Sequence, residues 1–444
     1  MSDFIERAKF SCALGGALTT IESLPRAVPI VHAAGGCAAS LSGTYNLAAG
    51  YRGLGYCGGT MIPTTNIAEN NIVFGGEDRL AEQIESTLRA MDADLYVVVS
   101  GCQVEIIGDN TVQVASRYGG RNVIGASTPG FSGNTYRGYD SVMTSVIRNV
   151  VRRSDEKEPR TVNILGVVPG HDVFFRGNLD ELRRLLGLIG VKANAFFGTG
   201  ESVESIRGYG SASLNVVLSA QAGLDSAKAF EAEHAIPFIQ SELPIGPSGS
   251  AEFLRRIGGA LGVPVEDVES AIERETREYY SYLERIVDVY TDLDFQRWAI
   301  VAADSYYAHA ITRFLANDLG WIPFLTAVHD IEGEREQAEY VALFADVTSE
   351  YKPKVIFERN PSRLLDEVRR AWADNHNDKY RDSPSPAYVV GSVIERGLAE
   401  ALGAGFLSVA FPVSNRVVLN KSAAGWRGAL TLVEDLLTNL VSAR

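Results

Sequence analysis

The stretch "DLYVVVSGC" at residues 94–102 carries the pattern that decides the fold, a short β-branched run that ends in a glycine and a cysteine. Its apolar positions are continuous, as in a strand that is buried on both faces of a parallel sheet. The preceding segment, 77–92, places apolar residues at helical spacing with charges elsewhere. A helix followed by a buried strand indicates an α/β unit.

The same order of strand, turn and helix recurs along the chain. It is found at residues 161–190, 214–235, 297–320, 353–375 and 387–411. We therefore expect an α/β fold with parallel sheets flanked by helices, and a length of 444 residues favours roughly two or three domains. The charged stretches 152–160 and 290–296 are candidate boundaries, and a helical insertion at 265–290 is long enough to bridge two units.

Composition excludes several classes of protein. Hydrophobic residues make up 46% of the chain and charged residues 22%, as in a globular protein that folds in water. No window approaches the roughly 18 continuous apolar residues of a membrane span. A net charge of −14 disfavours nucleic acid as a partner. The start, "MSDFIERAKF", lacks the apolar region of a signal peptide, so we expect a cytoplasmic protein.

Four cysteines, Cys12, Cys37, Cys57 and Cys102, all lie in the first quarter of the chain. Cys37 and Cys102 each follow an expected strand and a glycine, at the strand ends where α/β sheets carry ligands. Wide spacing excludes a compact CxxC motif, so Cys12, Cys37 and Cys102 are either small buried side chains or ligands gathered by the fold. Three thiolates are fewer than the four that a cubane requires, so another chain or another ligand type must complete such a site.

Other motifs carry less. The six histidines form no HExxH pattern, and His32, five residues before Cys37, is either a neighbour of that cysteine or a hydrogen-bonded core residue. "GLGYCG" at 53–58 matches GxGxxG without the strand and helix that a dinucleotide site needs, and no GK sequence supports a Walker loop. Glu77 and Asp78 fit the first turn of a helix.

Several segments together resemble a known family. "FSCALGGAL" (10–18), "PIVHAAGGC" (29–37), "AENNIVFGGEDRL" (68–80) and "SGCQVEIIGDN" (100–110) resemble, in order, the three cysteine segments and the VFGG helix start of the nitrogenase component 1 superfamily, most closely its β-type (K) subunits. "ASTPGFSGNTYRGYD" (126–140), "ELPIGPSGSAEFLRRIGGALG" (242–262) and "AFPVSNRVVLNKSAAGWRGAL" (410–430) continue the resemblance nearly to the end of the chain.

The resemblance implies three Rossmann-like domains: a cluster-binding domain at 1–158 completed by 415–444, with the C-terminal helix folding back, then 159–290 and 291–414. It implies that Cys12, Cys37 and Cys102 hold an iron–sulfur cluster of the 8Fe–7S P-cluster type, or a 4Fe–4S cluster, shared with a homologous α-type (D) subunit. Cys57 matches a cysteine that is not a ligand. The implied partners are that catalytic subunit, in a heterotetramer of two α-type and two β-type chains, and an ATP-dependent iron protein.

Two departures refine the implied function. Gly130 stands where β-type subunits have a serine that can bind the oxidised cluster, and no cysteine follows Cys102 to hold a catalytic cofactor, which we therefore expect in the partner. The resemblance is greatest to methylthio-alkane reductase, which cleaves C–S bonds reductively and releases methanethiol. The alternatives are the β-type chain of a dinitrogen-reducing nitrogenase and a cluster-assembly scaffold. Protochlorophyllide reductase resembles the chain less, because it lacks the VFGG-like segment.

Overall fold

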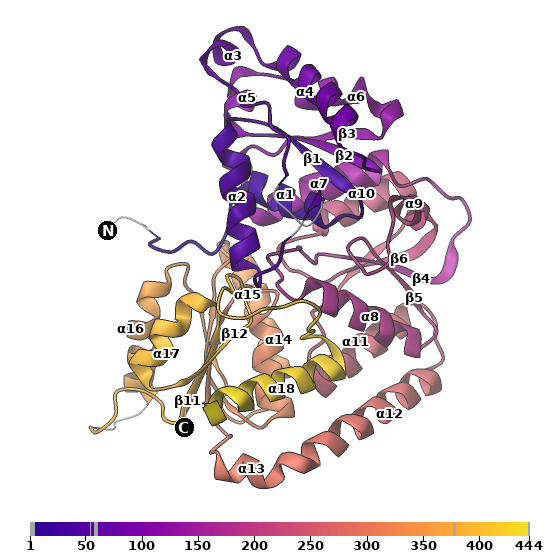
Figure 1. Cartoon of the computed structure of the whole chain (residues 1–444). Helices are drawn as coiled ribbons and strands as arrows, with labels where there is room; N and C mark the ends of the chain where they lie inside the picture. Colours follow the sequence, from indigo (N-terminus) through magenta and orange to yellow (C-terminus); the bar gives the residue numbers. More distant parts are fainter. Residues whose placement is uncertain (1–4, 54, 57–60, 376–378, 443–444) are drawn as a thin grey trace.

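Three parallel sheets, each covered by helices, make up the structure (Figure 1). The computed structural model describes residues 5–53, 55–56, 61–375 and 379–442. The spatial orders of the strands are β1-β2-β3, β5-β4-β6-β7 and β10-β9-β8-β11-β12. Neighbouring strands pair in parallel throughout these sheets, as the recurring strand–turn–helix order predicts.

The first sheet brings the ends of its strands level with one another. It consists of β1 (Ala27–His32), β2 (Leu95–Ser100) and β3 (Val123–Ala126). Every residue of β1 and β2 is buried, which explains the continuous apolar runs in the sequence. Because His32 pairs with Ser100 in the register of these strands, the loops that follow them leave the sheet at the same edge.

Helices surround this sheet. In chain order they are α1 (Ala13–Ser23), α2 (Gly35–Ala48), α3 (Glu69–Phe74), α4 (Glu77–Ala90), α5 (Cys102–Ile107), α6 (Thr111–Ser116) and α7 (Thr135–Asn149). In α4, Leu80 and Ile84 are fully buried against the sheet, as the helical spacing predicts. Glu77 and Asp78 lie in its first turn, where the helix dipole favours acidic side chains.

Helices α1 and α7 cross at very short range. A Cβ atom on Gly16 would lie 2.0 Å from the Thr135 carbonyl oxygen, and one on Gly138 would lie 1.9 Å from the Ala13 carbonyl oxygen. Only glycine permits such an approach of two backbones. The crossing therefore fixes the start of α1, and with it Cys12, relative to the segment that precedes α7.

The second and third sheets carry the rest of the chain. Their strands are β4 (Glu158–Leu165), β5 (Lys192–Ala195), β6 (Ala212–Val217), β7 (Phe238–Gln240), β8 (Trp298–Ala303), β9 (Ile322–Val328), β10 (Lys354–Phe357), β11 (Ala387–Gly391) and β12 (Gly405–Ser408). Their helices are α8 (Phe175–Leu188), α9 (Val203–Arg207), α10 (Leu224–His234), α11 (Gly246–Ala260), α12 (Val265–Leu283), α13 (Val287–Asp292), α14 (Ala308–Arg313), α15 (Glu334–Leu343), α16 (Leu364–Asn375), α17 (Arg396–Leu402) and α18 (Gly425–Ser442). The expected helical insertion is formed by α12 and α13, between the second and third sheets.

The position of the C-terminal helix corrects one prediction. We expected residues 415–444 to complete the first domain, but α18 packs on α8, α11, α12 and β12, away from the first sheet (Figure 1). Its buried apolar face, which includes Trp426 and Leu436, is covered by the second and third units instead. Apart from the first residue of β4, each sheet lies within one of the predicted segments 1–158, 159–290 and 291–414, whose boundaries stay a prediction.

No helix in the described part of the chain is long and apolar enough to cross a membrane.

The α1–α7 crossing predicts the effect of a single methyl group. Replacing Gly138 with alanine should lower the free energy of unfolding by about 3 kcal/mol, because the new Cβ meets backbone that cannot move aside independently. Gly187→Ala is the matched control, since its Cβ meets nothing within 4 Å and it lies near the exposed end of α8. Urea denaturation measures both variants. Equal stability of the two would contradict the crossing.

Candidate metal centre

Two of the predicted cysteines lie at the carboxyl edge of the first sheet. The chain leaves β1 and enters α2, in which Cys37 is the third residue. It leaves β2 and enters α5, in which Cys102 is the first residue, with Gly101 as the N-cap. Because β1 and β2 are parallel neighbours, the two cysteines emerge from the same edge, as the sequence predicts.

Cys12 reaches this edge from the N-terminal segment. It is the N-cap residue of α1 and forms an isolated antiparallel bridge with Asn134, while the Ala13 N–H donates to the Gly133 carbonyl at 3.0 Å. The neighbouring Ser11 hydroxyl lies 2.9 Å from the Tyr45 hydroxyl and 3.1 Å from Thr135 Oγ1. Helices α1, α2 and α7 are thus joined beside Cys12 by three hydroxyl groups.

Gly130 brings the three cysteines together. A Cβ atom on this residue would lie 3.0 Å from Cys102 Sγ and 3.3 Å from Cys12 Sγ. The Gly130 N–H donates a hydrogen bond to Cys102 Sγ at 3.1 Å. Cys37 lies near enough to both that, after burial, the charges of Cys102 and Cys12 raise the pKa of its thiol. The structure therefore gathers Cys12, Cys37 and Cys102, whereas Cys57 lies outside the described residues.

The thiol group of three has the properties of a cation site. All three cysteines are free thiols and half-buried, so the group opens on the surface of the chain. Each lies at the N-terminal end of a helix, where the backbone dipole stabilises negative charge. The mutual repulsion that raises the pKa of Cys37 is removed when a bound cation neutralises the thiolates. This donor set fits an iron–sulfur cluster, whose irons bind cysteine thiolates.

His32 supports the site as a core residue. It is fully buried at the end of β1, with Nε2 3.0 Å from Asp109 Oδ2 and Nδ1 3.1 Å from Thr65 Oγ1. Burial lowers the pKa of His32, opposed by Asp109. The Asp109 carboxylate also accepts from the Gly76 N–H at 3.1 Å and 3.0 Å. His32 therefore ties the turn after α5 to the start of α4, and it is the hydrogen-bonded core histidine of the two alternatives.

Several supporting residues carry no signal that single-sequence reasoning could use. Glu105 accepts from the hydroxyls of Ser100 and Ser127, the latter at 2.6 Å, and so joins the ends of β2 and β3. The Thr128 N–H donates to Ser100 Oγ at 2.9 Å. These contacts hold the loop that contains Gly130 against Cys102. Their one sequence signal is proximity to Cys102, which does not reveal which side chains meet.

Comparison with known proteins decides the family. Residues 12–441 match the family described as nitrogenase component 1 type oxidoreductase. The chain belongs to this family. The nitrogenase molybdenum–iron protein beta chain of Methanococcus maripaludis is 24% identical over 466 residues, which cover 97% of this chain and 93% of that protein.

Other members of the nitrogenase component 1 family are similar over most of the chain. The nitrogenase iron–molybdenum cofactor biosynthesis protein NifE of Clostridium pasteurianum is 26% identical, covering 89% of this chain and 81% of that protein. One polypeptide of the light-independent protochlorophyllide reductase of Leptolyngbya boryana is 23% identical, covering 85% and 73%. The solved structure of nitrogenase Cp1 at pH 6.5 superposes with a TM-score of 0.77 at 19% identity, over 100% of this chain and 94% of that one. The predicted nitrogenase component 1 fold is thereby confirmed.

An exposed apolar surface lies beside the metal centre of this family member. In α3, Val73 is 72% and Phe74 86% exposed, and in the neighbouring α5 Ile106 is 74% exposed. Large apolar side chains gathered at this exposure mark a surface that another protein covers. The surface lies on α3 and α5, the second of which begins at Cys102.

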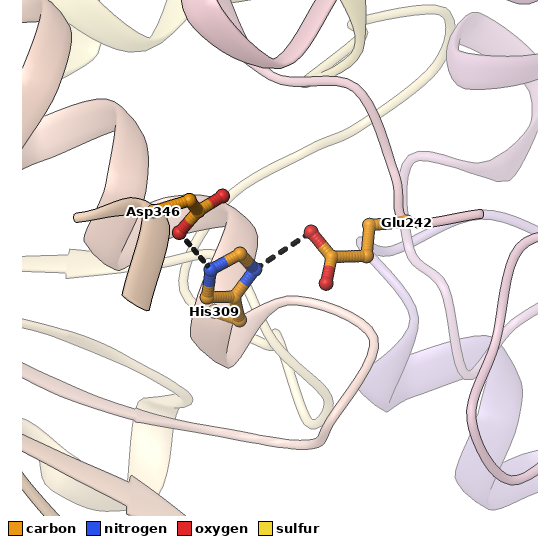
Figure 2. Close-up of side chains that lie close together, drawn as sticks. All are labelled: Glu242, His309 and Asp346. Carbon is orange, nitrogen blue, oxygen red and sulfur yellow. Dashed lines mark hydrogen bonds and ion pairs between the residues drawn. The ribbon is translucent and has the colours of Figure 1, made fainter. Parts of the chain in front are cut away.

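A second group of metal-type side chains, Glu242, His309 and Asp346, is satisfied by its own charges. His309 Nδ1 lies 2.7 Å from Glu242 Oε2, and His309 Nε2 lies 2.8 Å from Asp346 Oδ1, so the ring stands between the two carboxylates (Figure 2). Arg313 also contacts both acids. Burial alone would lower the pKa of His309, but the hydrogen bonds and charges of Asp346 and Glu242 raise it to about 9. The group is an ion network between the second and third units.

The raised pKa of His309 predicts a pH-dependent stability. Because the folded pKa of about 9 lies above the ordinary histidine value of 6.5, its contribution is complete below about pH 6.5 and is lost as the pH rises through 9. The contribution is about 3 kcal/mol, from the free energy per pKa unit. Urea denaturation between pH 6.5 and 9.5 should show a steeper loss of stability in the wild type than in His309→Gln. Parallel pH profiles of the two proteins would exclude this role of His309.

Proposed function

We propose that this chain is the electron-relaying β-type subunit of a nitrogenase-like reductase. Cys12, Cys37 and Cys102 supply three thiolate ligands to an iron–sulfur cluster. The observation that carries the proposal is their convergence at one half-buried edge, against a glycine that leaves room for no side chain. The cluster transfers electrons when bound, and this chain's residues hold it and place it at the surface.

The proposed cluster is shared with a second subunit. Three thiolates are too few for a 4Fe–4S cubane, which takes four, and the group opens on the surface where another chain can add ligands. A homologous α-type subunit contributes the remaining ligands, which suits an 8Fe–7S cluster of the P-cluster type, with a 4Fe–4S cluster as the alternative. The Gly130 N–H already donates to Cys102 Sγ, and a glycine offers no side-chain oxygen to the cluster.

The chemistry is assigned to the partner. No cysteine follows Cys102, so we assign the catalytic iron–sulfur cofactor to the α-type subunit of a heterotetramer with two chains of each type. An ATP-dependent iron protein supplies the electrons, and the exposed apolar surface of α3 and α5 supports a protein partner there. The complex is assigned to the cytoplasm, where reducing conditions keep the thiols free.

The substrate proposed is a methylthio-alkane, whose C–S bond is cleaved reductively to release methanethiol. The segments 126–140 and 410–430, with glycine at position 130, support a nitrogenase-like reductase over a nitrogenase. The β-type chain of a dinitrogen-reducing enzyme is the second candidate, favoured by the similarity to nitrogenase beta chains. A cluster-assembly scaffold is the third, favoured by the similarity to NifE.

Cysteine replacement tests the cluster. The purified complex carrying Cys37→Ala should lose most of its iron from the shared cluster, because one ligand of this chain is removed. Cys57→Ala is the matched control and should retain the iron, since Cys57 matches a cysteine that is not a ligand. Iron content and the electron paramagnetic resonance signal measure both variants. Full iron content in the Cys37→Ala complex would contradict the proposal.

A turnover assay tests the substrate. The complex, with its iron protein and ATP, should release methanethiol from dimethyl sulfide and form no ammonia from dinitrogen when both are assayed side by side. Ammonia without methanethiol would establish the nitrogenase candidate instead. A complex that reduces neither compound and transfers its cluster to an acceptor apoprotein would be a scaffold. The sequence of the partner provides a check, since a late cysteine and histidine should be present in it.

A further inference from the structure

Arg52, four residues beyond the end of α2, is a buried cation without a hydrogen-bond partner. The residue is 9% exposed, and none of its three side-chain nitrogens has a partner among the described residues. Its guanidinium lies over the Phe175 ring, 4.5 Å from the centroid. Burial lowers the pKa of Arg52 to about 10, which still leaves it charged at neutral pH.

The nearest acid does not neutralise Arg52 by contact. Asp172 interacts with it only through space, because both carboxylate oxygens are engaged elsewhere. Oδ1 accepts from the Phe174 N–H at 2.8 Å and from the Tyr307 hydroxyl at 2.6 Å, and Oδ2 accepts from Asn178 Nδ2 at 2.9 Å. A buried charge whose donors are unsatisfied is costly, so such groups normally meet a partner.

A second guanidinium lies beside the first. Arg176 in α8 is exposed, contacts the same Phe175 ring at 5.6 Å and takes part in no ion pair among the described residues. Nearby, Arg416 and Lys421 share a single acid, Asp435, with Lys421 Nζ 2.7 Å from Oδ1. In a chain of net charge −14, this region has more cations than acids.

Exposed apolar side chains surround the two arginines. Leu47 is 60%, Tyr51 54%, Val417 61% and Leu419 66% exposed. Backbone hydrogen bonds hold their two segments together, because the Val418 N–H donates to the Gly50 carbonyl at 3.0 Å. We call Leu47, Tyr51, Arg52, Arg176, Val417 and Leu419 the Arg52 surface. Arginine with aromatic and aliphatic groups is the composition of a protein interface, whereas a free oxyanion needs no apolar surround.

Helix α2 connects this surface to the metal centre. It begins next to Cys37 and ends next to Leu47, and at 14 residues it is roughly 20 Å long. Its outer face is uncovered, since Cβ atoms on Gly36 and Gly43 would meet nothing within 4 Å. In Figure 1, α2 stands at the side of the molecule. A standard interface of about 800 Å² per partner is roughly 30 Å across, so one partner can cover both ends of α2.

We propose that the Arg52 surface docks the α-type partner subunit, which presents a carboxylate to Arg176 and Arg52 and an apolar segment to the residues around them. The inference rests on the proposed function for the identity of that partner. Arg176 is exposed and meets the carboxylate first. Tyr51 has a left-handed φ of 50°, a strained conformation for tyrosine, so the segment before Arg52 can rearrange at low cost as the partner docks.

Subunit affinity tests the surface. The dissociation constant between this chain and its partner should rise at least tenfold for Arg52→Gln and about threefold for Arg176→Gln, and less than twofold for the control Arg274→Gln, an exposed arginine of α12. Added salt should weaken the wild-type complex more than either variant. Unchanged affinity of both variants would overturn the proposal.

Stability of the isolated chain separates docking from a structural role. Because Arg52 has no hydrogen-bond partner among the described residues, Arg52→Gln should leave the free energy of unfolding unchanged or higher while weakening the complex. A loss of stability that accompanies the loss of affinity would mean that Arg52 acts within the chain, and would overturn the docking role. Arg176→Gln, at an exposed position, keeps the affinity test valid in either case.

Cross-linking identifies the partner group. In the complex, Arg176→Lys treated with a carbodiimide should form an amide with an aspartate or glutamate of the α-type subunit, found by mass spectrometry, whereas Arg274→Lys should not. A cross-link only to Asp172 or Asp435, to the iron protein, or to a second copy of this chain would overturn the proposal.

The iron content separates this inference from the proposed function. If the complex forms without iron and the cross-link appears, the surface is established and the cluster proposal fails. If the complex is loaded with iron but Arg52→Gln and Arg176→Gln associate like wild type, the surface proposal fails and the cluster proposal stands.

Discussion

The contact of Gly130 with the sulfurs of Cys12 and Cys102 is the constraint on which the rest of the first unit depends. It requires the loop after β3 to lie against α5 and against the start of α1 at the same time. The first condition is met by Glu105, which joins the ends of β2 and β3. The second is met by the glycine crossing of α1 and α7, because a longer distance between these helices would move Cys12 away.

The charged groups of the chain divide into two kinds, and the division indicates where partners bind. Inside the molecule, charges are matched: His309 stands between two carboxylates, and Lys9 pairs with Glu395 at 2.7 Å. The Arg52 surface differs, because its two guanidinium groups lack such acids among the described residues. The half-buried cysteine thiols likewise have their opening toward the surface. Both features lie along α2, which makes this helix the natural axis of the interface with the partner.

Much of the fold could be predicted from the sequence, since buried parallel strands give continuous apolar runs and surface helices give regular spacing. The helix at 77–92 and the insertion at 265–290 are present as expected. The docking of α18 was predicted wrongly, because an amphipathic helix shows which face it buries and not which unit covers that face. For His32, the sequence left two roles open, and only the contacts with Asp109 and Thr65 decide between them.

By itself, the sequence determined the α/β class, the strand-end placement of Cys37 and Cys102, and the family resemblance, because these follow from local periodicity and from motifs in order. The tertiary structure decided which groups meet. The gathering of Cys12 with Cys37 and Cys102, the hydrogen bond from Gly130, and the unmatched charge of Arg52 depend on contacts between residues far apart in the chain. Such contacts are set by packing of helices and sheets, and spacing along the sequence carries no record of them.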